Sequence, residues 1–314
     1  MHKIQIGISS CLLGEEVRYD GGHKRNVYIT GALSQYFDFK AICPEMAIGL
    51  GVPRPTIRQV DMGQGVRVVG VKDPSLDVTD KLRSFSQEAC RRLQGISGYI
   101  LKKDSPSCGM ERVRVYNSSD MPEKRGRGIF ADTLMEAHPN LPVEEEGRLM
   151  DPLLRENFIE RVFIYFRWQQ LVKSGLTAQK LIEFHTRHKF NLLAHDEPIY
   201  RQLGRMVAEV DDNNLQALAN NYIDMLMGGL KKPASRKRHT NVLMHIMGFF
   251  KNQLSAEDKQ EMLDILDAYR LGQVPLIVPI TMLRHHLRRS PHPYIEQQYY
   301  MNPYPEELML RNSL

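Results

Sequence analysis

Short apolar runs alternate with amphipathic stretches along the first 135 residues of the chain. HKIQIGIS at 2–9, KAIC at 40–43 and GYIL at 98–101 are typical of buried strands, and Gly, Pro or Ser follows each of them. LDVTDKLRSFSQEACRRLQG at 76–95 has apolar residues near helical spacing and predicts a helix. Strand–helix–strand order predicts a parallel sheet with right-handed crossovers, so we expect an α/β, Rossmann-like N-terminal domain.

Long helical periodicity replaces this pattern from Leu153 onward. Helices are predicted over 156–175, 178–195, 199–210, 213–230, 241–254 and 255–272. Ser255, with Glu257 and Asp258 in the following turn, has the features of a helix N-cap. We therefore expect the second domain to be all-α.

The segment between these two patterns predicts a connector. HPNLPVEEEGRLMDP at 138–152 contains three prolines and the acidic run 144–146. We expect domains at 1–148 and 149–314, since a chain of 314 residues can bury a core in each. A further segment, MPEKRGRG at 121–128, is polar and contains glycine, which predicts a loop.

Composition narrows the class of protein. No run of eighteen apolar residues occurs, so no membrane span is predicted. No apolar leader or cleavage site opens the sequence, and we expect a cytoplasmic protein whose cysteines stay reduced. The net charge of +5 is modest for this length, so its distribution is more informative than its size.

Three of the four cysteines follow predicted strands. Cys11 ends the first apolar run, Cys43 ends the second, and Cys108 follows the third in ISGYILKKDSPSC. Strand ends of one polarity meet at one edge of a parallel sheet, where α/β proteins bind ligands. Three thiolates on a cubane iron–sulfur cluster would leave one iron without a protein ligand, free to act as a Lewis acid.

Other interpretations of these cysteines remain open on the residues alone. A single cysteine is most often a small buried apolar residue, and Cys90 in the predicted helix fits that description. Structural zinc sites usually contain CxxC pairs, which this sequence lacks. A disulfide is disfavoured in a reducing compartment.

The residues around the three cysteines resemble the TudS-type thiouracil desulfidases. The resemblance covers roughly the first 150 residues and rests on SSCLLG at 9–14, VRYDGG at 17–22, CPE at 43–45, GLGVPRP at 49–55 and LKKDSPSCG at 101–109. It implies a 4Fe-4S cluster that is held by Cys11, Cys43 and Cys108 and has one open iron. The catalytic residues of the family correspond to Glu45 and Ser105.

The C-terminal half, from about 150 to 308, resembles the YbgA-type domain. Together the halves resemble the fused RudS-type enzymes, which remove sulfur from 4-thiouridine in tRNA. The resemblance implies a non-redox desulfidase that converts 4-thiouridine to uridine and releases sulfide. Thiolated tRNA is its implied partner, and small thiolated pyrimidines such as free 4-thiouracil are further candidate substrates.

The residue types suit this chemistry. A thiocarbonyl sulfur is soft and matches an open iron better than a carbonyl oxygen does. Glu45 lies two residues from Cys43, so its carboxylate can take a proton from an attacking water, and Ser105 can orient that water.

Two short segments are candidates for substrate contacts. Asp20, Gly21 and Gly22 can approach a pyrimidine edge or a phosphate, although Asp–Gly is also a common turn. Lys102 and Lys103 can favour thiolates and an anionic substrate, although they fit ordinary surface lysines equally well.

Basic residues in two windows without acidic residues predict nucleic-acid binding by the second domain, and the resemblance implies that the nucleic acid is tRNA. We expect Tyr294, Tyr299 and Tyr300 to stack on exposed bases, although basic runs often mark only a solvated face. The windows lie between Asp224 and Glu257 and between Asp267 and Glu296, and the candidates are Lys231, Lys232, Arg236, Lys237, Arg238, Arg284, Arg288 and Arg289.

Histidines are not expected to take part in the site. His185, His188 and His195 lack HExxH spacing and a paired carboxylate, so we interpret them as ordinary core or surface residues.

Two rival functions remain. One is a desulfidase of free thiolated nucleobases only, against which the basic windows argue. The other is an iron–sulfur sensor that binds nucleic acid, against which the carboxylate of CPE argues, because a sensor needs no general base.

Overall fold

The computed structural model describes residues 3–63, 65–250 and 252–314. His2, at the start of the first predicted strand, lies outside these ranges. The chain divides into two compact units, Met1–Met150 and Asp151–Leu314.

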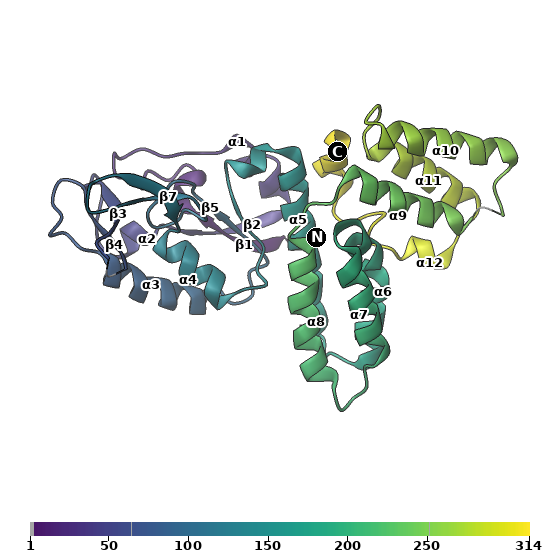
Figure 1. Ribbon diagram of the computed structural model, residues 1–314, viewed down its shortest axis with the longest axis horizontal. Helices are drawn as coiled ribbons and strands as arrows, with labels where there is room; N and C mark the ends of the chain where they lie inside the picture. The colour runs from purple at the N-terminus through teal and green to yellow at the C-terminus, as the bar shows by residue number, and fades with distance from the viewer. Residues whose placement is uncertain (1–2, 64, 251) are drawn as a thin grey trace. The chain divides into compact units, whose positions relative to one another are not determined.

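A parallel sheet forms the centre of the N-terminal unit (Figure 1). Its strands are β1 (Ile4–Ser9), β2 (Phe37–Ile42), β5 (Tyr99–Leu101) and β8 (Val143–Glu145), in the order β2-β1-β5-β8. All three pairings are parallel, which confirms the predicted α/β class. Gly7 in β1 is required by packing, because a Cβ there would lie 2.1 Å from the Tyr99 ring.

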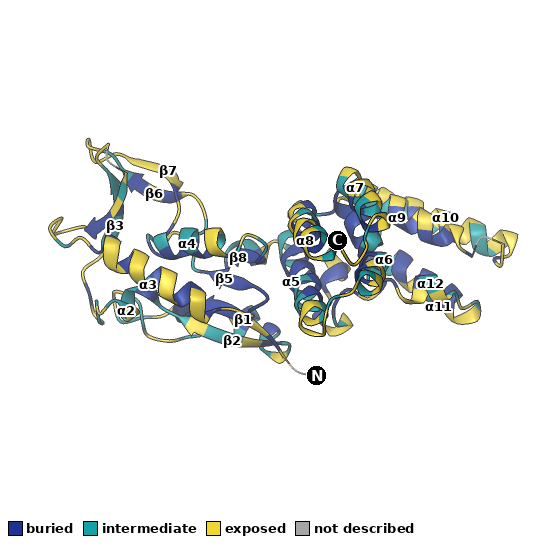
Figure 2. Cartoon of the chain, turned by 90° about the horizontal axis from the view of Figure 1, so that it is seen from below, coloured by how far each residue is buried: buried dark blue, intermediate teal, exposed yellow. Residues whose placement is uncertain are grey.

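Helices pack against one another beside this sheet. α3 (Thr79–Arg92) and α4 (Ile129–Ala137) contact each other closely, and Figure 2 shows the exposed face of α3. α3 places Leu82, Ala89 and Cys90 on its buried side, so Cys90 is a buried apolar residue of this helix. The short helices α1 (Val27–Thr30) and α2 (Pro44–Ala47) follow the first two cysteines in sequence.

A second sheet in this unit is not predicted by the sequence analysis. It contains β3 (Ile57–Asp61), β4 (Val66–Gly70), β6 (Val113–Tyr116) and β7 (Pro122–Gly126), in the order β4-β3-β6-β7. β3 and β6 are parallel, and the two outer pairs are antiparallel. The loop predicted at 121–128 is therefore wrong. β7 is an edge strand whose first four residues are exposed, so its sequence is polar although its backbone pairs with β6.

The connector predicted at 138–152 is wrong in its middle part, because β8 is a buried strand of the parallel sheet. The acidic run is buried because its carboxylates accept backbone hydrogen bonds. Met110 N donates to Glu145 Oε1 at 2.8 Å, and Lys103 N donates to Glu146 Oε2 at 2.8 Å. Satisfied carboxylates allow a polar sequence to form an interior strand.

The second unit is helical, as predicted. Its described residues form a first apolar cluster among the first four helices and a second among α6, α9, α10, α11 and the C-terminal segment. Ser255 is the N-cap of α10, since its Oγ accepts a hydrogen bond from Asp258 N at 3.0 Å. The helices are α5 (Pro152–Lys173), α6 (Ala178–His195), α7 (Glu197–Ala208), α8 (Leu215–Leu230), α9 (Arg236–Gly248), α10 (Ala256–Arg270), α11 (Ile277–Arg289) and α12 (Pro293–Glu296).

None of the helices in the described ranges combines the length and apolar character that a bilayer crossing requires.

Candidate active site

Three cysteines line one cavity at the carboxyl ends of the parallel strands. Cys11 lies in the 3-10 turn Ser10–Leu12 after β1, Cys43 follows β2 and precedes α2, and Cys108 lies in the loop after β5. The cavity has a volume of about 390 Å³, and Glu45, Ser105, Lys102 and Lys103 also line it. Parallel pairing of three strands is what brings these distant positions to one edge.

Cys11 and Cys108 are buried and Cys43 is half-buried, and the three thiols affect one another's pKa. Burial raises the pKa of the Cys11 thiol to about 11, although the Lys102 ammonium acts in the opposite direction. Burial also raises the pKa of Cys43, and it raises that of Cys108 well above the usual range, with a further contribution from Glu45. Thiolates at this site therefore need a bound cation to stabilise them.

The donor atoms suit an iron–sulfur cluster chemically, since all three are cysteine sulfurs. Within the described ranges, no three Cys, His, Asp or Glu side chains converge on a point that could hold one ion. In a cluster each cysteine binds a different iron, so the sulfurs surround a volume instead of meeting at a point. Cys11, Cys43 and Cys108 carry soft sulfur donors, and they line the cavity from three separate loops. A cluster that is bound by three cysteines requires such donors around one volume.

The third cysteine loop is tightly built. Ser105 Oγ accepts hydrogen bonds from Ser107 N at 3.2 Å and from Cys108 N at 3.0 Å, which closes the turn. Gly128, just before α4, lies against this turn, because a Cβ there would be 2.6 Å from Cys108 N. The buried Gln59 of β3 donates from Nε2 to Pro106 O at 3.0 Å. The second sheet thus supports the loop that carries Cys108.

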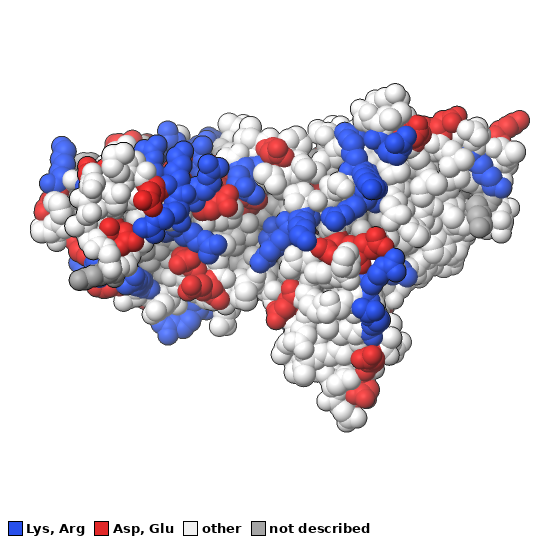
Figure 3. Space-filling view, viewed as in Figure 1, with Lys and Arg blue, Asp and Glu red and all other residues white. Residues whose placement is uncertain are grey.

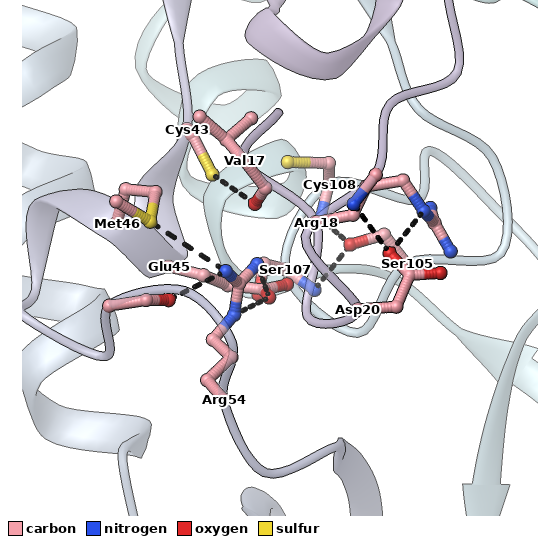
Figure 4. A network of polar contacts seen from close by, with 12 residues as sticks. Val17, Arg18, Asp20, Cys43, Glu45, Met46, Arg54, Ser105, Ser107 and Cys108 are labelled. Carbon is pink, nitrogen blue, oxygen red and sulfur yellow. Dashed lines mark hydrogen bonds and ion pairs between the residues drawn. The ribbon is translucent and has the colours of Figure 1, made fainter. Parts of the chain in front are cut away.

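Glu45 is held by two residues that the sequence analysis does not assign (Figure 4). Arg54 donates from Nε and Nη2 to Glu45 Oε2 at 3.0 and 2.6 Å. Ser107 donates from Oγ to Glu45 Oε1 at 2.9 Å. The exposed fractions of the side chains are 3% for Arg54 and 14% for Glu45, so the carboxylate has a fixed orientation at the cavity wall.

Both of these residues lie in motifs that the sequence displays. Arg54 is part of GLGVPRP and Ser107 is part of DSPSC, but nothing in the spacing indicates that they meet Glu45. Only the folded loops bring them together.

Of the two segments predicted to contact substrate, the lysine pair lines the cavity and the Asp–Gly–Gly segment does not. Asp20 is exposed and forms a turn, since its Oδ1 accepts from Gly22 N at 3.1 Å, and this hydrogen bond lowers the pKa of Asp20. Asp20, Gly21 and Gly22 do not line the cavity, whereas the preceding Arg18 and Tyr19 do.

The two lysines of the third loop both border the cavity but differ in their contacts. Lys102 is paired with Glu146 through its ammonium, whereas the exposed side chain of Lys103 extends over Gly147.

Half of the predicted tRNA-binding cations are already engaged inside the helical unit. Lys232 pairs with Asp196 at 3.0 Å, and Arg238 donates to His195 O. Arg236 lies over the Tyr269 ring at 5.1 Å, and Arg284 pairs with Glu306 at 2.5 Å. The exposed ones without an ion pair in the described ranges are Lys231, Lys237, Arg288 and Arg289.

Of the three tyrosines expected to stack on bases, Tyr300 is wrongly predicted, and Tyr294 and Tyr299 are half-buried and contact other side chains. Tyr300 is fully buried, and its hydroxyl lies 2.9 Å from His239 Nδ1. Tyr299 stacks on His188 and lies beneath Arg167 at 3.8 Å. Tyr294 is half-buried and packs against Phe190 of the second apolar cluster and against the exposed Phe249. The C-terminal segment packs on the helices, so its aromatic side chains contribute to the apolar core of this unit.

The interpretation of His195 as a residue without a paired carboxylate is also wrong. His195 Nε2 lies 3.0 Å from Glu160 Oε2, and both side chains are buried. The partner is on a different helix, α5, so sequence spacing cannot reveal it. His185 and His188 are buried among aromatic rings.

Each half of the chain matches a known protein family. Residues 6–146 match the 2-thiouracil desulfurase family, and residues 189–305 match the family described as "Protein of unknown function (DUF1722)". "Uncharacterized protein YbgA" of Escherichia coli is 34% identical over 154 residues, which are 49% of this chain and 91% of that protein. "Uncharacterized protein YbbK" of Bacillus subtilis is 30% identical over 148 residues, 45% of this chain and 96% of that protein.

The chain belongs to the 2-thiouracil desulfurase family and, in its second half, to the DUF1722 family. A solved structure described as a 4Fe-4S-dependent thiouracil desulfidase, TudS, is 33% identical, covers 48% of this chain and 95% of its own, and has a TM-score of 0.36. Within the desulfurase match lie Cys11, Cys43, Glu45, Ser105 and Cys108.

Proposed function

We propose that this protein is a non-redox desulfidase that converts 4-thiouridine in tRNA to uridine. The net reaction replaces the thiocarbonyl sulfur with oxygen from water and releases the sulfur as hydrogen sulfide. The observation that carries the proposal is the cavity in which three cysteines from separate strand ends face one oriented carboxylate. Membership of the 2-thiouracil desulfurase family supports the reaction class.

The proposed cofactor is a 4Fe-4S cluster held by Cys11, Cys43 and Cys108. When bound, such a cluster supplies a Lewis-acidic iron that has an affinity for soft sulfur. Reduced thiols are needed to receive it, which agrees with a cytoplasmic location.

Glu45 is proposed as the general base that accepts the proton of the attacking water. A carboxylate must lie within hydrogen-bond reach of that water, and Glu45 borders the cavity that takes the substrate. Arg54 and Ser107 hold both carboxylate oxygens, so few of its rotamers remain available. Ser105 lines the same cavity, and while its oxygen accepts two backbone hydrogen bonds, its hydroxyl can donate to the substrate or to the attacking water.

The tRNA part of the proposal is supported by charge. Lys231, Lys237, Arg288 and Arg289 are exposed on the helical unit without ion pairs in the described ranges. Cations without a neighbouring carboxylate contribute most to the affinity for RNA, because they have no ion pair to give up when they contact a phosphate. Figure 3 shows Lys and Arg side chains on both halves of the chain, among them a group in the region of β5 and β7.

The test is anaerobic purification followed by two assays of sulfide release. We expect about four irons per chain, and sulfide release from tRNA that contains 4-thiouridine. A parallel assay with free 4-thiouracil shows whether small thiolated pyrimidines are also substrates. A protein that binds the cluster and releases no sulfide from either substrate would be a sensor instead of an enzyme.

Three variants assign the roles. Cys43→Ala should lose the cluster, whereas the matched variant Cys90→Ala, at the buried cysteine of α3, should keep it. Glu45→Gln should keep the cluster and lose turnover by about a hundredfold, as is typical of a general base. Turnover at the wild-type rate in Glu45→Gln would exclude the proposed base.

A further inference from the structure

A row of cationic side chains crosses one face of the second sheet. The parallel register that pairs Gln59 with Val115 places Arg58 of β3 beside Arg114 of β6. Arg114 in turn pairs directly with Lys124 of β7. Cross-strand neighbours share a face, and strands are about 4.8 Å apart, so the three cations lie within about 10 Å of one another.

This row is unfavourable for the sheet on its own, because like charges that face each other across strands destabilise it. The surroundings neutralise little of the charge. Arg58 reaches Asp120 at 2.6 Å, but the Asp120 side chain is 70% exposed, and such surface pairs contribute little. Arg114 and Lys124 are exposed and have no ion pair in the described ranges. Two of the three cations have no acid beside them in the described ranges and the third has only an exposed one, which indicates an anionic ligand.

An aromatic ring lies in the next row of the same face. Tyr116 follows Arg114 by two positions on β6, and the Arg58 guanidinium lies over its ring at 4.6 Å from the centroid. Arg58 Nε is buried and has no hydrogen-bond acceptor within the described ranges. An open sheet face that combines arginine, lysine and a tyrosine ring is typical of surfaces that bind single-stranded RNA.

The other face of this sheet is not available to a ligand. Gln59, Val113 and Val115 point into the interior and are buried, and Gln59 supports the loop of Cys108. Among the described residues at the centre of the sheet, those exposed lie on the face that carries the cations.

The open face also begins at the edge of the active-site cavity. Thr56, two residues before Arg58, lines the cavity, and Val71 N donates to Thr56 O at 2.8 Å, which continues the pairing of β3 with β4. Residues two apart on an extended strand lie on the same face, so Thr56 joins the face of Arg58 to the cavity. A chain of nucleotides with one base in the cavity would therefore have its neighbouring phosphates within reach of this face. That continuity favours RNA over an acidic protein as the occupant.

We propose that this face, formed by Arg58, Arg114, Tyr116 and Lys124, binds the RNA backbone next to the thiolated nucleotide. Arg114 and Lys124 contact phosphates, and Tyr116 with Arg58 above it contacts a base or ribose. The N-terminal unit thus grips RNA itself, in addition to the surface proposed on the helical unit. The inference rests on the proposed function, since it takes tRNA as the substrate.

The variant Lys124→Glu tests this inference because it moves binding and stability in opposite directions. It places an acid opposite Arg114, so the melting temperature should stay equal or rise, while affinity for tRNA falls. We expect the Kd of the full chain for an unmodified tRNA transcript to rise about fivefold or more. The slope of log K for tRNA binding against the logarithm of the salt concentration should become shallower by about 0.7 for each phosphate contact that is removed. Arg91→Glu, an equal charge change at an exposed position of α3, is the matched control and should change the Kd less than twofold.

A second variant, Arg114→Gln, removes one charge without adding another and should weaken binding in the same direction. Unchanged tRNA binding in both variants, or equal weakening in Arg91→Glu, overturns the inference. Failure of the proposed function gives a different result, because the wild-type chain would then release no sulfide from thiolated tRNA. If the wild type does release it and Lys124→Glu binds tRNA normally, only this inference is wrong.

Discussion

The ion pair between Arg54 and Glu45 is the clearest case in which one residue determines what another can do. A carboxylate at a cavity wall can rotate toward solvent, and it then no longer faces a substrate. Here Arg54 contacts one oxygen through two nitrogens, and Ser107 contacts the other. Arg54 also donates to Gly51 O at 3.0 Å, so the guanidinium is itself fixed to the loop before β3.

Removing Arg54 should therefore cost stability as well as orientation. We expect Arg54→Ala to lower the free energy of unfolding by about 3 kcal/mol, because it leaves a mostly buried carboxylate without its cation. The double variant with Glu45→Gln should recover part of that loss, because the charge that lacks a partner is then gone. Urea denaturation followed by circular dichroism measures both.

The control for this prediction is Arg83→Ala, whose partner Asp80 is 74% exposed and 3.6 Å away. It should cost less than about 1 kcal/mol. A double variant that is no more stable than Arg54→Ala would show that the pair is not coupled.

At the scale of single elements, α5 has an unusual interior. It buries two carboxylates four residues apart, Glu156 and Glu160, and like charges at this spacing destabilise a helix. His195 of α6 pairs with Glu160, and Arg311 near the C-terminus lies 3.8 Å from Glu156. The Tyr304 hydroxyl donates to Glu156 Oε1 at 2.9 Å.

The two carboxyls respond to pH in opposite ways. Burial and the neighbouring Glu160 raise the pKa of Glu156 to about 7, whereas His195 lowers that of Glu160 to about 2 against the effect of burial. Between pH 4.5 and 7 the folded chain holds a proton on Glu156 that the unfolded chain has lost. Stability from this group therefore falls as pH rises through that window and is level above it. The contribution of Glu160 is present above pH 4.5 and is lost only as pH falls toward 2.

We accordingly expect Glu156→Gln to gain stability relative to the wild type as pH rises from 5 to 8, by roughly 1–3 kcal/mol. The fluorescence of Trp168, the one tryptophan of the chain, reports unfolding of this unit because it lies in α5 within the first apolar cluster. Glu257→Gln, at an exposed position of α10, is the matched control. The same pH dependence in both variants would contradict the assignment.

At the scale of the whole molecule, the chain joins a desulfurase unit to a helical unit. If the substrate is tRNA, as proposed, its binding by the helical unit and the chemistry on the thiolated base can be separated by mutation. The exposed cations without ion pairs in the described part of the helical unit are the ones to change, because Lys232 and Arg238 also hold the unit together.

We expect Lys231→Glu with Lys237→Glu to weaken tRNA binding and to reduce the salt slope by about 1.4 units, if each lysine contacts one phosphate. Turnover of free 4-thiouracil should remain within twofold, because both changes lie outside the desulfurase unit. Lys173→Glu with Arg205→Glu reverses the same charge at other exposed helical positions and is the control. Equal losses on tRNA and on 4-thiouracil would indicate misfolding instead of lost binding.

The sequence predicts the parallel sheet and the all-α half well, because their signals are local. Apolar runs mark β1, β2 and β5, and helical periodicity marks the second unit. It does not predict β7 or β8, because an exposed edge strand and a strand with satisfied carboxylates both look polar. Arg54, Ser107 and the partner of His195 are missed because each depends on contacts between distant segments.

The loop that carries Cys108 is anchored by carboxylates that follow β5 by more than forty residues, at Glu145 and Glu146. During translation, the cysteine pocket is therefore incomplete until the ribosome has released the chain to about residue 150. Residues 151–314 then take roughly ten to thirty seconds to be made at about 5–20 residues per second. That interval is long enough for a domain of this size to fold, so the pocket that contains the three cysteines can form before synthesis of the helical unit is complete.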